Sequence, residues 1–134
     1  MKPRRVLVAT DHHHCPGAAL EHGAALAGPD GELVLASVLV VPMAQPLGAN
    51  MERAVGEACA LLDASEREST AATLDTRLVR ARSFAEGVLD TLAAEPFDLL
   101  VLEKARGGGR DGMAEQIAEI LERADVTVAV VRPR

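Results

Sequence analysis

The chain has 134 residues and carries 20 acidic against 14 basic side chains, which gives a formal net charge of -6 at pH 7. This length suits a single domain, residues 1–134, with one core of ordinary size. The acidic balance and the lack of any basic run longer than Arg4-Arg5 argue against a nucleic-acid partner and against binding to a charged membrane surface.

Cysteine usage and hydropathy indicate the compartment. Cys15 and Cys59 are the only cysteines and form no CxxC motif, so we do not expect a disulfide framework. No segment approaches the ~18 consecutive apolar residues that a membrane-spanning helix requires. We therefore expect a cytoplasmic protein without membrane insertion.

The first half of the chain alternates strand and helix patterns. Residues 4–10 contain the continuous apolar run Val6-Leu7-Val8-Ala9, which is typical of a strand buried on both faces of a parallel sheet. A broad apolar face over residues 18–26 predicts a helix, and residues 32–41 predict a second buried strand. Apolar side chains at helical spacing predict a longer helix over residues 50–65, with Asn50 as its N-cap.

The middle of the chain contains a less buried strand and a well-marked helix start. Residues 70–79 alternate apolar and polar side chains, which predicts a strand exposed on one side near a sheet edge. Ser83 and Glu86 have the spacing of a capping box, in which the hydroxyl and the carboxylate satisfy free backbone donors. We expect a helix that starts at Phe84 and ends before Pro96.

The last part of the chain has the frame of a nucleotide-binding fold. Residues 97–102 predict a buried strand, and three consecutive glycines at residues 107–109 follow it, as in loops that cradle phosphates. Asp111 is the candidate N-cap of the next helix, and residues 126–131 predict the final strand. The apolar face of that helix is assigned to Met113, Ile117, Leu121 and Ala124. The alternation predicts an open, mostly parallel α/β sheet with helices on both faces.

Three stretches carry a resemblance that covers the whole chain: RRVLVATD near the start, RARSFAEGVLDTLAAEPFDLLVLE in the third quarter, and IAEILERADVTVAVVRP at the end. Together and in this order they resemble the universal stress protein family. The resemblance implies a Rossmann-like, adenine nucleotide alpha hydrolase-like fold with an open five-stranded parallel sheet in the order 3-2-1-4-5. It also implies a homodimer through the last strands, with edge residues Val126, Val128, Val130 and Arg132; an apolar unpaired edge independently favours such a partner.

In nucleotide-binding members of that family, ATP lies at the carboxyl ends of strands one and four, where ligands generally sit in such sheets. The resemblance places Asp11, directly after Thr10, at the acidic position on the adenine side. It places Val38 at the apolar position beside the base. These positions are retained in the chain.

The phosphate motif of the family, G-x2-G-x9-G-[S/T], is lost. Its first glycine falls on Glu103 and its second on Arg106. Its closing pair falls on residues 114–115 or 115–116, which are Ala-Glu or Glu-Gln. A carboxylate at the first position is the opposite of what a phosphate requires.

Two interpretations of the glycine loop remain open. It is either a flexible solvent loop or a rewired anion site in which Arg106 and Arg110 replace the missing hydroxyl with charge. Glu103 opposes the second interpretation unless it pairs with Lys104 or Arg106, or contacts a ribose hydroxyl.

Asp11 either contacts a ligand or accepts hydrogen bonds from a turn or helix N-terminus. The candidate nucleotide-binding residues are Thr10, Asp11, Val38, Glu103, Arg106, Gly107, Gly108, Gly109, Arg110 and Gly112.

A run of potential metal ligands, His12, His13, His14 and Cys15, follows the first strand. Imidazole and thiolate are natural ligands of zinc and nickel, but adjacent residues rarely all face one ion, and no distant pair completes the set. We expect a solvated loop without a metal, and keep a bound metal or a redox-sensitive Cys15 thiol as alternatives. Cys59 is assigned to packing on or beside the buried face of its helix.

No nucleophile, base and oxyanion donor come together in the sequence, so we do not predict an enzyme. The slow ATP hydrolysis that the resemblance allows depends on motif residues that are lost here. We predict a stress-associated regulatory or interaction protein with an unidentified protein partner and no cofactor, which does not bind ATP in the usual way. The alternative is a sensor that binds ATP, AMP or a cyclic nucleotide through Asp11, Val38 and the Gly/Arg loop.

Overall fold

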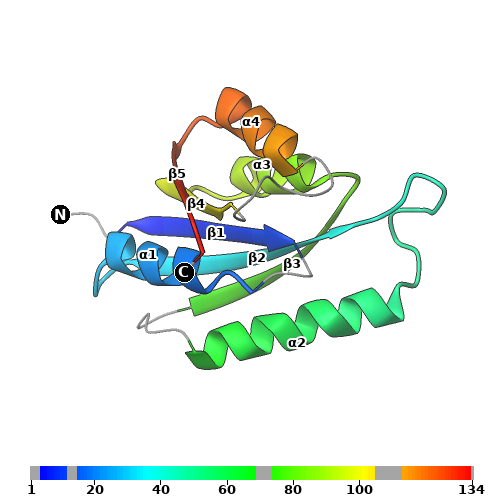
Figure 1. The fold of residues 1–134 in the computed structure, drawn as a ribbon, viewed down its shortest axis with the longest axis horizontal. Coiled ribbons are helices and arrows are strands. Elements are labelled where there is room, and N and C mark those ends of the chain that lie inside the picture. The colour runs from blue at the N-terminus through cyan, green and yellow to red at the C-terminus, as the bar shows by residue number, and fades with distance from the viewer. Residues whose placement is uncertain (1–3, 12–14, 69–73, 105–112, 134) are drawn as a thin grey trace.

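The computed structural model describes residues 4–11, 15–68, 74–104 and 113–133. The described residues form nine elements that alternate between strand and helix (Figure 1). In chain order they are β1 (Arg5–Asp11), α1 (Gly17–Ala27), β2 (Glu32–Val40), α2 (Glu52–Glu68), β3 (Leu74–Ala81), α3 (Phe84–Ala94), β4 (Leu99–Glu103), α4 (Met113–Arg123) and β5 (Thr127–Val131).

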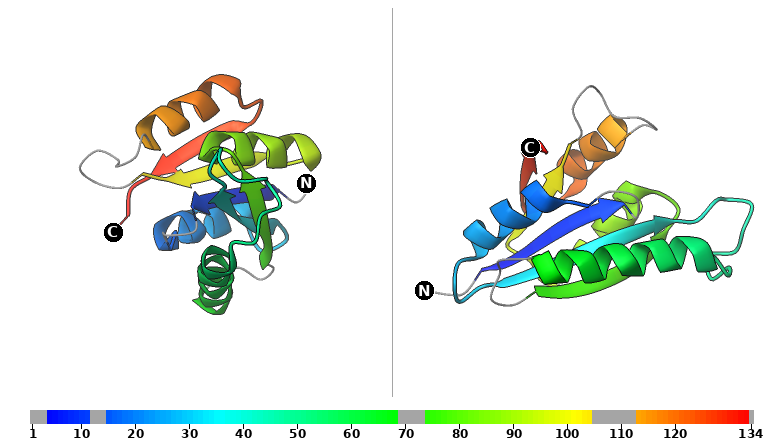
Figure 2. Two further views of the ribbon diagram at one scale, coloured as in Figure 1. Left: turned by 90° about the vertical axis from the view of Figure 1, so that its right-hand side faces the viewer. Right: turned by 60° about the horizontal axis from the view of Figure 1, so that its bottom comes forward.

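The five strands form one parallel sheet in the order β3-β2-β1-β4-β5. Helices α1 and α2 cover one face of the sheet, and α3 and α4 cover the other (Figure 2). The predicted Rossmann-like architecture and strand order are therefore confirmed. β3 lies at one edge, as its alternating pattern predicted, and β5 lies at the other edge.

Each face of the sheet has its own aliphatic core. The core under α1 and α2 consists of Val6, Val8, Ala19, Leu20, Ala27, Leu33, Leu35, Leu62 and Val101. The core under α3 and α4 is larger and contains both phenylalanines; it consists of Leu7, Ala9, Val34, Ala36, Val38, Ala81, Phe84, Ala85, Val88, Phe97, Leu100, Leu102, Ile117 and Ile120. Because successive residues of a strand point to opposite faces, neighbouring residues of β1, β2 and β4 belong to different cores.

The two helix starts that were assigned from the sequence have different outcomes. In α3 the Ser83 hydroxyl accepts a hydrogen bond from the backbone N–H of Glu86 at 3.1 Å, so the predicted cap is confirmed. In α2 the first intrahelical hydrogen bond goes to the carbonyl of Met51. Asn50 therefore lies one residue too early to be the N-cap, and that prediction is wrong.

The structure also corrects two assignments of helix faces. Leu121 was assigned to the apolar face of α4, but it is 52% exposed, whereas Ile120 is fully buried. Cys59 was assigned to packing, but it is exposed, and Ala58 faces the sheet in its place. One residue is a rotation of about 100° around a helix, which moves a side chain from the core to solvent. Among the described residues, no helix has the length and apolar character needed to cross a membrane.

Candidate functional site

The topology places a switch point at the carboxyl ends of β1 and β4. These strands are neighbours in the sheet, but α1 follows β1 on one face and α4 follows β4 on the other. In open α/β sheets, ligands bind outside the carboxyl ends of the strands at such a point. The candidate residues on β1, β2 and β4 all lie near this end of the sheet, because they come late in their strands.

Asp11 and Val38 are brought together as direct register partners of β1 and β2. Asp11 is half-buried at the end of its strand. The Val38 side chain is fully buried in the core under α3, where a Cβ on Gly87 would lie 2.7 Å from its Cγ1 atom. Val38 therefore presents only its backbone to a ligand at the strand end.

A row of polar side chains crosses three neighbouring strands on the face covered by α1. Thr10 of β1 pairs with Ser37 of β2. On the other side of β1, Ala9 pairs with Leu102 of β4, so the next residues, Thr10 and Glu103, lie beside each other. Thr10 is 5% exposed and Ser37 is 0% exposed. No described residue gives the Ser37 hydroxyl a hydrogen-bond partner. We call Ser37, Thr10 and Glu103 the polar row.

Glu103 joins β4 to the start of α1. Its Oε1 atom accepts a hydrogen bond from the backbone N–H of Ala19, in the first turn of α1, at 3.1 Å. The N-cap residue of α1 is Pro16, which makes no side-chain capping bond, and the first turn contains no acidic residue. The carboxylate of Glu103 thus lies at a helix N-terminus, where backbone N–H groups favour negative charge.

The sequence analysis assigned Glu103 to a position of the phosphate motif, but it did not predict the hydrogen bond to Ala19. The hydrogen bond joins residues that are 84 positions apart, so no local pattern announces it. Ser37 was also passed over, because it lies inside an otherwise apolar strand. A hydroxyl inside such a strand is the one sequence signal that marks the polar row.

The histidine run lies outside the described residues, so the possibility of a metal at His12, His13 and His14 stays untested. Cys15 is exposed, and its Sγ atom lies 3.9 Å from the hydroxyl of the fully buried Ser65. Within the described part of the chain, no group of three or more His, Cys, Asp or Glu side chains is placed to hold a metal ion.

The glycine loop also lies outside the described residues. Arg106, Gly107 to Gly109, Arg110 and Gly112 therefore remain candidate residues without a structural test, as does Asp111 as an N-cap. Of the predicted nucleotide site, the structure brings together the four described residues on β1, β2 and β4: Thr10, Asp11, Val38 and Glu103.

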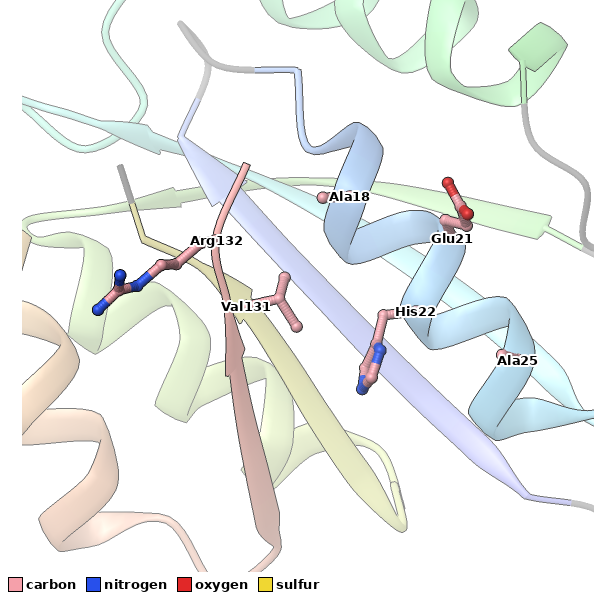
Figure 3. A pocket seen from close by; sticks show the side chains of 6 residues that line it. All are labelled: Ala18, Glu21, His22, Ala25, Val131 and Arg132. Carbon is pink, nitrogen blue, oxygen red and sulfur yellow. The ribbon is translucent and has the colours of Figure 1, made fainter. Parts of the chain in front are cut away.

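A shallow groove of about 330 Å³ lies between α1 and the end of β5 (Figure 3). Its lining residues are Ala18, Glu21, His22, Ala25, Val131 and Arg132. Figure 3 shows His22 and Val131 directed toward one another, whereas Glu21 and Arg132 point away from the space between them. The groove is close to the polar row, because Val131 is the register partner of Glu103.

The four residues predicted for the dimer edge lie on or beside β5. Val126 and Val128 pack against the core under α3 and α4. Val130 is 40% exposed, and Arg132 is exposed just beyond the strand. β5 pairs with β4 on one side and forms an edge of the sheet on the other.

Comparison with known proteins identifies the family. The sequence profile described as "Universal stress protein family" matches residues 2–132, which is nearly the whole chain. The chain belongs to the universal stress protein family. The resemblance inferred from the three sequence stretches is thereby confirmed. A search among curated proteins gave no match.

Solved universal stress proteins share this fold. One in complex with cAMP is 19% identical, with a TM-score of 0.63 and 98% of each chain covered. One from Archaeoglobus fulgidus in complex with dAMP is 13% identical, with a TM-score of 0.71, covering 96% of this chain and 97% of the other. A family member from Burkholderia pseudomallei is 24% identical, with a TM-score of 0.66 and 96% of each chain covered. At these identities the likeness concerns the fold.

Proposed function

We propose that this universal stress protein is a non-enzymatic regulatory or interaction protein that does not bind ATP in the usual way. The observation that carries the proposal is the hydrogen bond at 3.1 Å between Glu103 Oε1 and the N–H of Ala19. It puts a carboxylate of the protein at the end of β4, where the phosphate motif of the family would begin.

Electrostatics explains why this arrangement opposes a triphosphate. Like charges within about 4–6 Å disfavour each other's ionised form, and the cost grows as water is excluded. Glu103 also uses one of the N–H groups that would attract an anion to the start of α1. A triphosphate at this end of β4 would therefore have to displace or approach a fixed negative charge.

The rest of the proposal concerns assembly and location. We propose that residues 1–134 act as a single cytoplasmic domain and that two copies associate through β5 (Thr127–Val131). The unpaired edge of β5 supports this, because an exposed edge presents backbone groups that another strand satisfies. The regulatory role would then be exerted through a protein partner on the surface of the dimer.

Calorimetric titration of nucleotide-stripped protein tests the central claim. ATP, ADP, AMP and cyclic AMP are each added without magnesium and then with it, and a thermal melt confirms that the protein is folded in the same buffer. We expect no saturable binding of ATP at micromolar concentration. Tight ATP binding would show that the glycine loop has rebuilt the lost motif, and would overturn the proposal.

A second function, an adenine-nucleotide sensor, is favoured by one specific arrangement. Asp11 and Val38, the two retained positions on the adenine side, are direct register partners at the strand ends. Solved structures of the same fold include one in complex with cAMP and one in complex with dAMP. If this function holds, the double substitution Arg106→Ala and Arg110→Ala lowers affinity for the phosphorylated nucleotide. An unchanged affinity would count against the sensor.

A further inference from the structure

The connection between β2 and α2, residues 41–51, projects beyond the end of the sheet, as Figure 1 and Figure 2 show. Val41 at its start is buried, but residues 42–48 are all exposed. Most residues of the connection are apolar, and none of them is charged. The connection therefore carries apolar side chains that do not pack into either core of the protein.

Large apolar side chains gather on this connection. Met43 is 81% exposed, Leu47 is 44% exposed, and Val40, the last residue of β2, is 38% exposed. The other exposed large hydrophobic residues of the described chain, Leu121 and Val130, belong to α4 and β5. Single exposed apolar residues are common on protein surfaces, whereas a group of them on one segment is typical of an interaction site. Methionine also adapts its shape readily to a partner.

The backbone of the connection is fixed by its own hydrogen bonds. The N–H of Gln45 donates to the carbonyl of Pro42 at 3.0 Å, and the N–H of Ala49 donates to the carbonyl of Pro46 at 2.9 Å. A segment that is ordered in advance loses less conformational entropy when it binds a partner. The exposed apolar side chains are thus presented on a pre-formed backbone.

Two guanidinium groups contact the connection from the end of β3. Arg82 Nη1 donates to the carbonyls of Pro42 and Gln45 at 2.7 Å each, and Arg80 Nη1 donates to the carbonyl of Ala49 at 2.7 Å. Both side chains are half-buried. A guanidinium has five N–H donors, so each arginine retains donors that these bonds do not use.

The charge of this surface differs from that of the whole molecule. The chain has a formal net charge of -6, but among the described residues no carboxylate forms an ion pair with Arg80 or Arg82. This includes the acidic residues in the first turns of the two adjacent helices, Glu52 of α2 and Glu86 of α3. A complementary partner would therefore carry carboxylates beside apolar side chains.

We propose that residues 40–49, together with Arg80 and Arg82, form a docking surface for a protein segment that carries large apolar side chains next to aspartate or glutamate. Met43 and Leu47 contact the apolar side chains of this segment, and Arg82 pairs with a carboxylate through a charge-assisted hydrogen bond. The inference rests on the proposed role as an interaction protein, and it names the surface and the chemistry of the partner.

Selection from a library of random short peptides tests the proposal. Peptides displayed on phage are selected on the immobilised full chain, and those that also bind the double variant Met43→Ser and Leu47→Ser are removed. We expect the remaining peptides to combine large apolar residues with an excess of Asp and Glu over Lys and Arg. No enrichment over the starting library, or enrichment of basic or purely apolar peptides, would overturn the inference.

Variants then separate apolar contact from charge. One selected peptide is synthesised and titrated into each variant by fluorescence anisotropy, and thermal melts confirm that the variants are folded. Met43→Ser and Arg82→Gln should each weaken binding about tenfold. Arg82→Lys keeps the charge and should weaken it by only about threefold. Equal losses in the two Arg82 variants would overturn the role of charge.

Leu121→Ser is the matched control, because Leu121 is 52% exposed but belongs to α4. It should leave the affinity for the peptide unchanged. A loss as large as that of Met43→Ser would show that the peptide binds exposed apolar residues without preference, and would overturn the inference.

Other occupants of the surface give different results. Self-association that Met43→Ser abolishes in light scattering would identify a second copy of the chain as the occupant, and would overturn the inference. Binding to phosphatidylserine vesicles that Met43→Ser abolishes would identify a membrane, and would also overturn it. Failure of the peptide selection would leave the absence of ATP binding untouched, whereas tight ATP binding would overturn that claim and not the docking surface. The two failures are therefore distinguishable.

Discussion

The Arg5 guanidinium, at the start of β1, and the Glu95 carboxylate, directly after α3, form an ion pair of 2.8 Å. Arg77 of β3 adds a second contact of 3.2 Å to the same carboxylate oxygen. The Arg5 guanidinium also lies 4.5 Å from the centre of the Phe97 ring. This network joins the amino end of β1 and the middle of β3 to the residue that follows α3.

We expect this network to make stability depend on pH. The hydrogen bond from Arg5, followed by the one from Arg77, holds the pKa of Glu95 below its ordinary value. Because the pKa is lower in the folded state, the stabilisation is complete above the unfolded pKa and is lost as the pH falls through the folded one. Glu95→Gln should lower the free energy of unfolding by about 1 kcal/mol near neutral pH. The difference from wild type should shrink as the pH falls below the ordinary pKa of a glutamate, about 4.3.

Urea denaturation at several pH values measures this effect, and Glu57→Gln is its control. Glu57 of α2 pairs at 3.5 Å with Arg53, whose side chain is 95% exposed. Such surface pairs contribute little, so Glu57→Gln should change stability by less than about 0.5 kcal/mol. Equal losses in both variants at neutral pH would show that the Arg5–Glu95 network has no special role.

Two glycines on helices should respond oppositely to alanine. A Cβ on Gly87 of α3 would lie 2.7 Å from Val38 Cγ1 and 3.2 Å from the Cβ of Ala81, and Val38 is a stiff, fully buried side chain. Gly87→Ala should therefore destabilise the protein by about 1–3 kcal/mol. Gly56 of α2 has open space around it, so Gly56→Ala should stabilise by about 0.5–1 kcal/mol. Equilibrium unfolding measures the stability of both variants. A Gly87→Ala variant more stable than the wild type would contradict the tight packing at Val38.

The connection between β2 and α2 extends away from the sheet (Figure 1). Two arginines, one near the end of β3 and one directly after it, hydrogen-bond to this connection. Arg82 donates hydrogen bonds of 2.7 Å to the carbonyls of Pro42 and Gln45. Arg80 donates one of 2.7 Å to the carbonyl of Ala49. Arg82→Ala should speed backbone amide exchange in residues 42–50 by about tenfold, because local opening becomes easier. Arg53→Ala is the control, because it removes an arginine that pairs with Glu57 of the same helix. Equally fast amide exchange in residues 42–50 of that variant would refute the role of Arg82.

The proposed dimer predicts a specific sensitivity at β5. Val130 is 40% exposed at the sheet edge, and a lysine there is a known means of blocking strand pairing. Val130→Lys should weaken dimerisation about tenfold or more, as measured by light scattering over a dilution series. Leu121→Lys is the matched control, because Leu121 is 52% exposed but belongs to α4 and not to the strand proposed to pair. A wild-type monomer, or a Val130→Lys dimer of unchanged affinity, would refute the interface.

Local patterns predicted the order of the elements well, because each strand and helix carries its own period. The apolar run of residues 6–9 and the capping serine Ser83 need no distant contact to be recognised. Helix faces were less predictable. Leu121 and Ile120 are both apolar neighbours, and only packing against the sheet decides which of them is buried.

The candidate site was also predictable only in part. Asp11 and Val38 were assigned from the family resemblance, and the register of β1 and β2 makes them partners. The burial of the Val38 side chain was not foreseen, because it depends on how closely α3 approaches at Gly87.

The sequence by itself determined the family and the parallel fold, because these depend on residue type, period and spacing along the chain. Only the tertiary structure decided which side chains meet at the carboxyl ends of β1, β2 and β4. It brings the Glu103 carboxylate to the N–H of Ala19, 84 positions away, and it leaves the buried Ser37 hydroxyl without a partner among the described residues. Hydrogen bonds of this kind depend on which strands become neighbours, and that neighbourhood exists only once the sheet has formed.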